Sequence, residues 1–368
     1  MNNLLMLAIL ASVFSQIDKM GSILRPVMYL SWIVVIGYGL IKNGLKIHFS
    51  KFLQVYVGAY FIWVIICIIL TLFGSNHLNG NYVRIMEIPL LITVVAELMT
   101  NIDQDNVLKL CKVYVIAAVI FALWVNLKYF SSYKEWISSA IYTYAQKNSA
   151  AQIWSSAVLL VVFYLKPKSI KDKIFWYSIA GYLVVVSALS QCRTAILAMT
   201  FSVFVYVLVH SKYKLRIFLT TCVLFFIVVR IPFINQFIDK VFFISKYAGT
   251  DLNTMSSGRL DHWARSMNIF WDNMLFGCGK WYVDCSYLLV LAECGIVGFI
   301  LIEVIWITRI CTVVTSNNNF AGLKKVVLCM VVFYVIESLL EGFPPFGPGV
   351  SSFLFWLLCA LSCRKQTD

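Results

Sequence analysis

Long apolar runs separated by short polar stretches are the dominant pattern of this chain. A helix needs roughly 17–25 predominantly apolar residues to cross the hydrocarbon core of a bilayer. Runs near this length predict about twelve transmembrane helices, with ten to twelve as the range. The predicted spans are 3–17, 23–41, 52–73, 82–99, 108–127, 149–165, 174–190, 194–210, 215–231, 286–308, 326–340 and 350–363. The pattern therefore predicts an all-α polytopic membrane protein.

The composition leads to the same fold class. The 368 residues are 61% hydrophobic and only 13% charged, and the mean hydropathy is +0.84. Soluble domains carry about 25% charged residues, so this chain cannot cover the surface of a soluble globule with polar groups. A soluble enzyme is thereby excluded.

The basic residues predict the orientation of the chain in the membrane. The net charge is +13, but the lysines and arginines punctuate the apolar runs instead of gathering on one segment, which argues against nucleic-acid binding. They concentrate in the connections 42–51, 166–173, 211–216 and 309–325 and in the tail, whereas 74–81 and 341–349 contain none. Short loops rich in Lys and Arg face the cytoplasm. This distribution predicts an even number of spans, with both termini in the cytoplasm.

Three larger connections then face outward: 128–148, the tight turn near 191–193, and the segment 232–285. We interpret residues 1–368 as one integral membrane domain, with 232–285 as its large extracytoplasmic loop. This loop is a polar island in an apolar chain, and loops are the usual carriers of function. Four glycines are expected to permit tight turns and close helix contacts: Gly277 and Gly279 in this loop, and Gly295 and Gly298 in the span that follows it.

Arginines near this outer side are candidates for anion binding. Arg193 lies between two apolar runs; an arginine in mid-membrane costs at least about 2.5 kcal/mol, so it must lie at an interface, in a cavity or in a pair. Its guanidinium could clamp a phosphate, because it offers a fixed fork of donors and keeps its charge. An interfacial anchor is the alternative.

A second group of polar residues lies within the long loop. Arg259, His262 and Arg265 follow an i, i+3 spacing, so a helix would place them on one face, and Ser256 or Ser257 would cap that helix. An amphipathic helix on the membrane surface would have the same pattern. His262 could act as a base near neutral pH, or it could be an ordinary surface histidine.

Polar residues at other predicted membrane boundaries complete the candidates. Asp284 lies at the outer mouth of the span 286–308, where a carboxylate in a partly dry cavity could take a proton from a sugar hydroxyl. An acid placed near a helix N-terminus for its dipole is the alternative. Lys147 and Asn148 precede the span 149–165, as an interfacial lysine and a capping asparagine would. Glu341 frames the last outward hairpin and could help to line a cavity.

The sequence lacks the motifs of nucleotide and metal chemistry. It has no Walker A motif, no GxGxxG, no serine-hydrolase elbow and no DxD-like pair in a loop, which disfavours a nucleotide-driven pump and a nucleotide-sugar transferase. The eleven cysteines form neither a CxxC motif nor a Cys/His pair at metal-ligand spacing. We therefore expect neither a metal nor a cofactor.

Several segments together resemble the bacterial O-antigen polymerase and O-antigen ligase superfamily. Each is loose by itself, but their order, spacing and shared outward placement are fairly specific over most of residues 140–360. They are 147–150 (KNSA), 190–195 (SQCRTA), 257–260 (SGRL) followed by Trp263, 275–279 (LFGCG), 284–289 (DCSYLL), 293–298 (ECGIVG), 337–342 (ESLLEG) and 348–349 (PG). The resemblance implies a membrane glycosyltransferase fold of the GT-C type, with a large extracytoplasmic loop.

The same resemblance implies a function and a set of roles. The enzyme would transfer glycan from undecaprenyl pyrophosphate at the outer face of the bacterial plasma membrane, without a nucleotide sugar or a metal. Arg193 and Arg259, supported by Arg265, would bind the pyrophosphate and stabilise its charge as it leaves. Asp284 would be the base for the acceptor hydroxyl, with His262 as a weaker candidate.

The remaining candidates are implied to bind substrate: Lys147, Asn148 and Glu341. The expected partners are the lipid-linked donor and acceptor, the bilayer itself and a chain-length regulator protein.

Three functions stay open. Ligases usually carry a His-Asn pair where this chain has Asp284-Cys285, so the chain looks more like a polymerase that joins O-antigen or capsule repeat units. A ligase would instead move the glycan to lipid A core or to protein. A flippase for lipid-linked sugars is the third. A transporter is expected to place its charges near the bilayer midplane and to show two related halves, whereas the charges here concentrate in an outward loop.

Overall fold

The computed structural model is helical, and no strand occurs among the residues that it describes. These are residues 2–17, 21–44, 49–99, 102–129, 147–165, 167–242, 244, 249–256, 258–316, 322–347 and 352–363. Ser257, Pro348, Gly349, most of the connection 128–148 and the basic tail after 363 lie outside them.

Each predicted span contains a helix. The helices are α1 (Asn2–Phe14), α2 (Gly21–Lys42), α3 (Lys51–Leu72), α4 (Asn81–Ile85) with α5 (Glu87–Leu98), α6 (Gln104–Tyr129), α8 (Lys147–Leu160) extended by a π-helical turn (Val161–Leu165), α9 (Ile170–Leu189), α10 (Arg193–His210), α11 (Lys214–Val229), α15 (Ser286–Thr315), α16 (Leu323–Leu340) and α17 (Phe353–Ser362). In the described part of the chain, six are long and apolar enough to cross a membrane: α2, α3, α6, α8 with its π-helical turn, α9 and α15. The protein is therefore an all-α membrane protein, and twelve spans remain a prediction.

The span predicted at 82–99 is divided at Met86 into α4 and α5. Pro89 has no N–H with which to bond the carbonyl of Ile85, and Ile85 is the last residue of α4. The proline instead occupies the first turn of α5, where the N–H has no partner within the helix. The prediction of one continuous helix was wrong because hydropathy does not register this lost hydrogen bond.

Arg309 was predicted in a cytoplasmic connection but lies buried inside α15, which continues to Thr315. Its guanidinium carbon is 3.4 Å from the centre of the Phe52 ring, and its Nη2 donates to Thr93 Oγ1 at 3.3 Å. The cation–π contact offsets part of the desolvation of this charge. A hydropathy pattern treats every arginine as an interruption, because it cannot include an aromatic partner from another helix.

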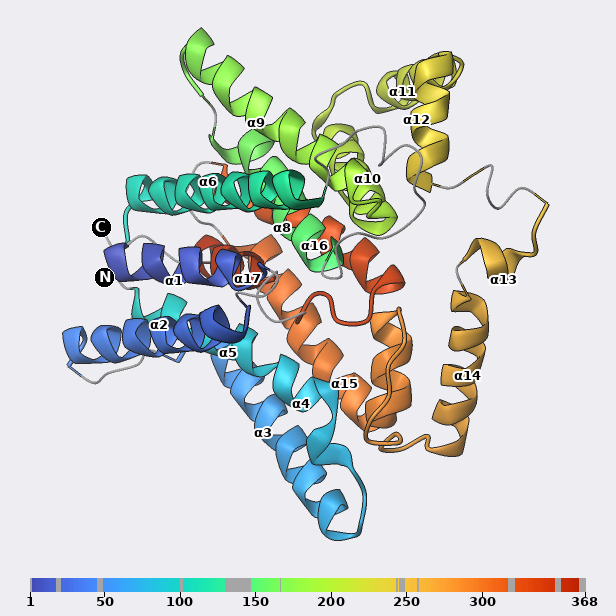
Figure 1. Ribbon diagram of the computed structural model, residues 1–368. Coiled ribbons are helices and arrows are strands. Elements are labelled where there is room, and N and C mark those ends of the chain that lie inside the picture. The colour runs from blue at the N-terminus through green and yellow to red at the C-terminus, as the bar shows by residue number, and fades with distance from the viewer. Residues whose placement is uncertain are drawn as a thin grey trace.

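The predicted loop 232–285 contains three helices among its described residues: α12 (Pro232–Phe242), α13 (Leu252–Met255) and α14 (Arg259–Asp272). Figure 1 shows α13 and α14 on the right, whereas α1 begins on the left, at the opposite end of the long helices. The polar island is therefore a helical unit attached to one end of the apolar bundle.

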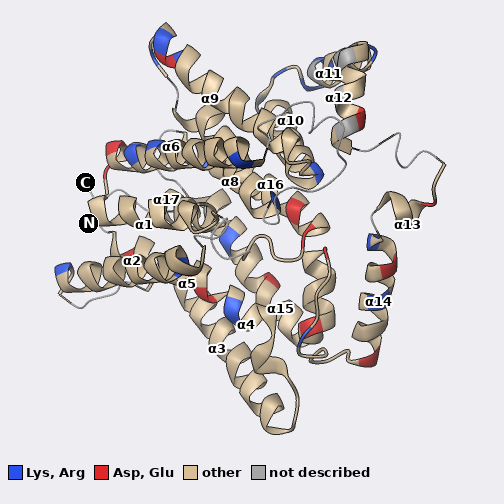
Figure 2. Cartoon of the chain, in the orientation of Figure 1, with Lys and Arg blue, Asp and Glu red and all other residues tan. Residues whose placement is uncertain are grey.

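Helix α8 lies in the middle of the bundle, with α6, α9, α10 and α16 packed around it (Figure 1). Every residue from Ala150 to Leu160 is buried. Outer helices such as α2 and α3 expose isoleucine, phenylalanine and leucine side chains, as lipid-facing surfaces do. In Figure 2 the middles of these long helices carry almost no charge, and Lys, Arg, Asp and Glu lie near helix ends and on α14.

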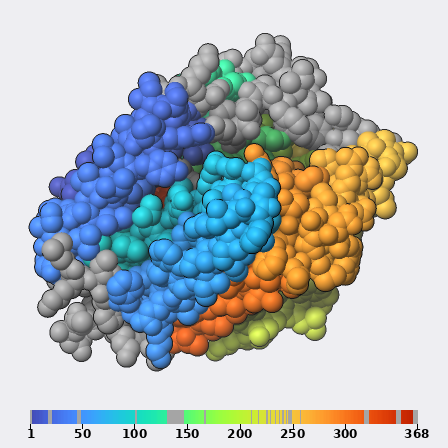
Figure 3. Space-filling view, turned by 90° about the horizontal axis from the view of Figure 1, so that it is seen from below, coloured from blue at the N-terminus to red at the C-terminus, as the bar shows by residue number. Residues whose placement is uncertain are grey.

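Helix α15 is broken at Gly295, where the backbone adopts φ 65° and ψ −170°. The break frees helical backbone groups, and the segment 274–279 pairs with them. Cys278 N and Gly279 N donate to Ala292 O and Glu293 O at 2.9 and 3.0 Å, and Ile296 N and Val297 N donate to Met274 O and Leu275 O at 2.9 and 3.1 Å. The loop is thus inserted into the helix. Helix α3 packs against α15, and the blue surface of this part of the chain adjoins the orange surface in Figure 3.

The predicted role of the glycines is confirmed at this insertion. A Cβ on Gly295 would lie 2.5 Å from the backbone of Leu275, and a Cβ on Gly277 would lie 2.3 Å from the backbone of Glu293. Both glycines also have positive φ, 65° and 75°. Only glycine allows the two backbones to approach this closely.

Candidate active site

A cavity of about 470 Å³ lies where α14 meets the ends of α8, α10 and α16. Its volume falls within the range of about 300–1,000 Å³ that small-molecule sites occupy. The lining residues are Lys147, Asn148, Gln191, Arg193, Thr194, Leu197, Phe242, Met255, Ser256, Arg259, Trp263, Asp284, Leu340 and Glu341.

Helix ends bring these residues together. Helix α8 begins at Lys147, α10 begins at Arg193, and α16 ends at Leu340. Because helix ends lie at the boundary of an apolar bundle, polar side chains there can converge without crossing the hydrocarbon region. The site is therefore assembled from segments that are nearly 200 residues apart in sequence.

Six of the eight candidate residues line this cavity: Lys147, Asn148, Arg193, Arg259, Asp284 and Glu341. His262 and Arg265 are not among the lining residues, and both are exposed. Their predicted contact with substrate stays a prediction.

The predicted common face of Arg259, His262 and Arg265 is not the one that α14 turns to the cavity. The inward side chains are Arg259, Trp263, Ser266 and Phe270, spaced i, i+4, i+7 and i+11. Each residue advances about 100° around a helix, so two steps of three residues carry Arg265 about 120° away from Arg259. The i+4 neighbour Trp263 shares the inward face of Arg259.

Glu341 holds four elements together at the cavity wall. Its carboxylate accepts hydrogen bonds from Asn148 Nδ2 at 2.9 Å, Thr194 Oγ1 at 3.1 Å and Arg259 Nη2 at 3.3 Å. The residue is only 7% exposed, and burial raises its pKa, an effect that the nearby Arg259 charge opposes. Three donors occupy most of the lone-pair positions of this carboxylate.

Asp284 has a more open environment. Its side chain is 37% exposed, and Oδ2 lies 3.7 Å from Arg259 Nη2. The Tyr282 hydroxyl donates to Oδ1 at 2.7 Å. Burial, followed by the hydrogen bond to Asp284, raises the pKa of Tyr282, so this hydroxyl keeps its proton and remains a donor. Asp284 thus retains accepting capacity toward the cavity.

Local hydrogen bonds fix the position of α14. At its N-terminus, Ser256 Oγ accepts from Leu260 N at 3.4 Å and Asn253 Oδ1 accepts from Asp261 N at 3.2 Å. The N-cap residue itself is Gly258, so Ser256 bonds the first turn from outside the predicted cap position, and Ser257 lies outside the described residues. Along the helix, Trp263 Nε1 donates to the backbone oxygen of Asp284 at 3.1 Å. A second indole, that of Trp281, donates to Ser266 Oγ at 2.9 Å.

The segment that carries Asp284 is anchored in turn by buried Glu293. This carboxylate accepts from Asn81 Nδ2 at 2.7 Å, Tyr82 N at 2.9 Å and Trp281 N at 3.4 Å. Glu293 lies outside the cavity lining. Its contacts position the loop rather than the substrate.

Sequence reasoning did not name the polar lining residues Gln191 and Thr194, and it gave Ser256, which also lines the cavity, only a capping role. Gln191 and Thr194 both lie within two residues of Arg193 in the 190–195 segment, and this closeness to a candidate residue could have indicated that they line the same site. The charged lining groups sum to three cations, Lys147, Arg193 and Arg259, against two carboxylates. Such a cavity favours an anionic ligand.

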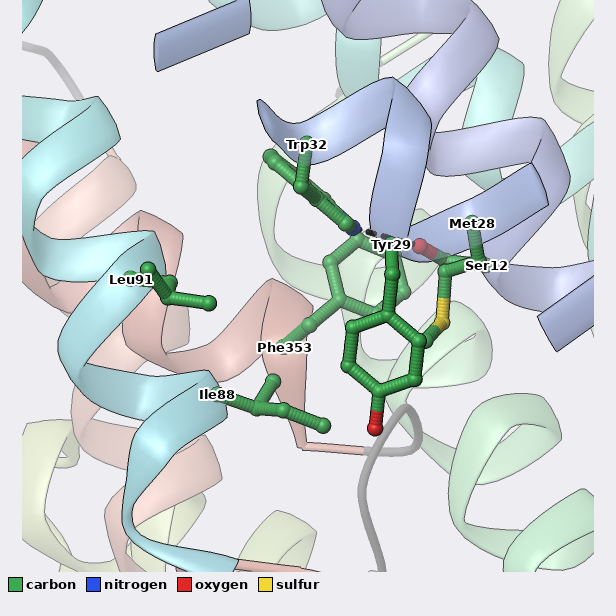
Figure 4. Close-up of a pocket in the computed structure, with 7 residues that line it drawn as sticks. All are labelled: Ser12, Met28, Tyr29, Trp32, Ile88, Leu91 and Phe353. Carbon is green, nitrogen blue, oxygen red and sulfur yellow. Dashed lines mark hydrogen bonds between the residues drawn. The ribbon is translucent and has the colours of Figure 1, made fainter. Parts of the chain in front are cut away.

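A second cavity, of about 10 Å³, lies between α1, α2, α5 and α17. It is lined by Ser12, Met28, Tyr29, Trp32, Ile88, Leu91 and Phe353 (Figure 4). Trp32 Nε1 donates to Ser12 Oγ at 2.9 Å across one side, and apolar side chains form the rest. A space of this size holds at most about one water molecule, so it is a gap in helix packing.

Residues 178–285, from within α9 to the start of α15, match the family model described as O-antigen ligase. This part of the chain is similar to the O-antigen ligase family. The match confirms the resemblance to the O-antigen polymerase and ligase superfamily and does not separate the two activities. No curated protein matches the chain. The matched stretch contains Arg193, Arg259 and Asp284, whereas the lining residues of α8 and α16 come from outside it.

Proposed function

We propose that this protein is a polymerase that joins undecaprenyl-pyrophosphate-linked oligosaccharide repeat units by glycosyl transfer at the outer face of the bacterial plasma membrane. The observation that carries the proposal is the single cavity that collects three cations beside an accessible carboxylate. A lipid-linked diphosphate needs cationic donors for its head and apolar surface for its tail. The family match supports the superfamily independently.

The position of the cavity suits a ligand that is half lipid. Arg193 is the first residue of α10, and Leu197, one turn further along, lines the same cavity and is 47% exposed. In this proposal the diphosphate lies at the helix end, and the first isoprene units run down the apolar surface of α10 into the bilayer.

The reaction follows from these groups. Lys147, Arg193 and Arg259 hold the diphosphate, whose oxygens only accept hydrogen bonds. The acceptor hydroxyl gives its proton to Asp284, and its oxygen attacks the anomeric carbon of the donor sugar. A new carbon–oxygen bond forms while the bond from that carbon to the phosphate oxygen breaks, and the diphosphate leaves with the bonding electrons. Cations positioned in advance stabilise this charge as it develops.

A ligase is the second candidate, and the description of the matching family favours it. A ligase would use the same donor and the same cations but would accept on lipid A core or on protein. The resemblance at Asp284-Cys285, where ligases carry His-Asn, favours the polymerase. Only the acceptor distinguishes the two reactions.

Deleting the gene and separating the surface glycan on a gel tests the reaction class. If the protein is a polymerase, its deletion should leave surface glycan that carries only a single repeat unit. Free polymer without attachment to lipid A would instead indicate a ligase, and loss of lipid-linked repeats from the outer leaflet would indicate a flippase.

Substitutions in the cavity test the site itself. Arg193→Ala, Arg259→Ala and Asp284→Ala should abolish polymer while the protein remains in the membrane. One preorganised donor typically contributes about 10²–10³-fold in rate, and one general base about 10²–10⁴-fold.

The matched control is Lys280→Ala, which removes a positive charge from an exposed position of the same loop. The surface glycan of this control should give the same ladder of polymer lengths on the gel as wild type. Wild-type ladders from all three cavity variants would contradict the site assignment.

A further inference from the structure

The turn between α9 and α10 contains a backbone conformation that the local sequence does not favour. Gln191 has φ 55°, and among the described residues it is the one non-glycine residue with positive φ. Its N–H donates to Ala188 O at 2.9 Å, which closes the turn. A side chain with a Cβ is strained in this region, and such residues cluster at functional sites.

The side-chain amide of Gln191 also lacks a hydrogen-bond partner among the described residues. The residue is 6% exposed and lines the cavity, yet its amide makes no hydrogen bond to any residue in the described part of the chain. The other short polar side chains on this wall, Asn148 and Thr194, are both held by Glu341. The amide is therefore available to a ligand in the cavity. A glycine would remove both the strain and the unpaired amide.

The chemistry of an amide differs from that of the neighbouring cations. Lysine and arginine only donate hydrogen bonds, whereas a glutamine side chain both donates and accepts. Phosphate oxygens only accept, but a sugar hydroxyl does both. Gln191 lies two residues before Arg193 and lines the same cavity, so a diphosphate held by Arg193 would bring its attached sugar to this part of the wall.

We propose that Gln191 binds a hydroxyl of the donor sugar that is attached directly to the diphosphate, and so contributes to the choice of that sugar. This inference rests on the proposed function. It adds a sugar contact to a cavity whose cationic donors, Lys147, Arg193 and Arg259, are suited to phosphate.

The test compares a ligand that has the sugar with one that lacks it. Wild type, Gln191→Gly and Gln191→Asn are measured for the KM of lipid-linked repeat unit extracted from the deletion strain, and for inhibition by undecaprenyl pyrophosphate. For Gln191→Gly we expect thermal stability equal to or above that of wild type, because glycine fits the turn. Its donor KM should rise about 2- to 10-fold, the value of one neutral hydrogen bond, with inhibition unchanged.

Two further variants calibrate these measurements. Asparagine tolerates the left-handed conformation and keeps a shorter amide, so Gln191→Asn should fall between wild type and Gln191→Gly. Arg193→Ala, which should not form polymer, is compared by direct binding, where its affinity for the repeat unit and for undecaprenyl pyrophosphate should fall alike.

Three outcomes contradict the proposal in distinguishable ways. A wild-type KM in a stable Gln191→Gly variant would show that the amide does not contact the donor. If that variant bound the repeat unit and undecaprenyl pyrophosphate equally weakly, the amide would be assigned to the phosphates instead. If undecaprenyl pyrophosphate did not compete even with wild type, the proposed function itself would fail, and the sugar contact with it.

Discussion

At the scale of single residues, Glu341 and Asp284 are two carboxylates on one cavity with different surroundings. Glu341 is buried and accepts from three donors, whereas Asp284 is partly exposed and accepts from the Tyr282 hydroxyl. Environments of this kind commonly separate the roles of paired acids. In the proposed reaction, Glu341 positions Arg259, and Asp284 receives the proton.

Glu341→Gln should change how stability depends on pH. Burial raises the pKa of Glu341 above its ordinary value of 4.5, so the folded protein keeps a proton that the unfolded chain releases. This contribution is fully present below pH 4.5 and is lost as the pH rises through the folded pKa, with a slope of at most about 1.4 kcal/mol per pH unit. The measurement is the free energy of unfolding in detergent from about pH 4 to pH 8. The value for wild type minus the value for Glu341→Gln should fall with this slope as the pH rises. A constant difference across that range would contradict it.

At the scale of elements, the broken helix α15 decides where Asp284 can lie. The segment 274–279 occupies the break at Gly295 through four backbone hydrogen bonds, and the chain then continues to Asp284 and back into α15. A straight helix would leave this segment without backbone partners. The break therefore connects the core of the bundle to the cavity.

Gly295→Ala should destabilise the protein and lower activity together. The new Cβ would lie 2.5 Å from the Leu275 backbone in a residue with φ 65°, and left-handed strain alone costs about 1–2 kcal/mol. Thermal unfolding and polymer formation are the measurements. Gly181→Ala on α9 is the matched control, because nothing lies within 4 Å of its Cβ position. Equal melting temperatures for the two variants would contradict the inserted loop.

At the scale of the whole molecule, the cavity lies at one end of the bundle, because α8 and α10 begin there and α16 ends there. The positive-inside pattern predicts that this end is extracytoplasmic. A fluorescent protein fused after residue 368 should therefore fluoresce, and a phosphatase inserted between residues 249 and 256 should be active. The reverse pair of results would place the cavity on the cytoplasmic side.

The sequence predicted the helices well, because burial in lipid imposes a length and a composition on each span. It failed where one interaction overrides that average: Pro89 divides a span by removing a hydrogen bond, and Phe52 allows Arg309 into a helix. It also proposed the wrong partner for Arg259 on α14. A three-residue spacing permits a shared face, but docking of Trp263 and Ser266 selects another.

The sequence alone determined the membrane class, the positions of the helices and the residue types at the site. These depend on local quantities, namely apolar length, charge and motif order. Only the tertiary structure decided that Lys147, Arg193, Arg259, Asp284 and Glu341 line one cavity, and that His262 and Arg265 do not. It also revealed the strained, uncommitted Gln191. Convergence of helix ends and choice of a helix face are set by packing between distant segments, which no local pattern contains.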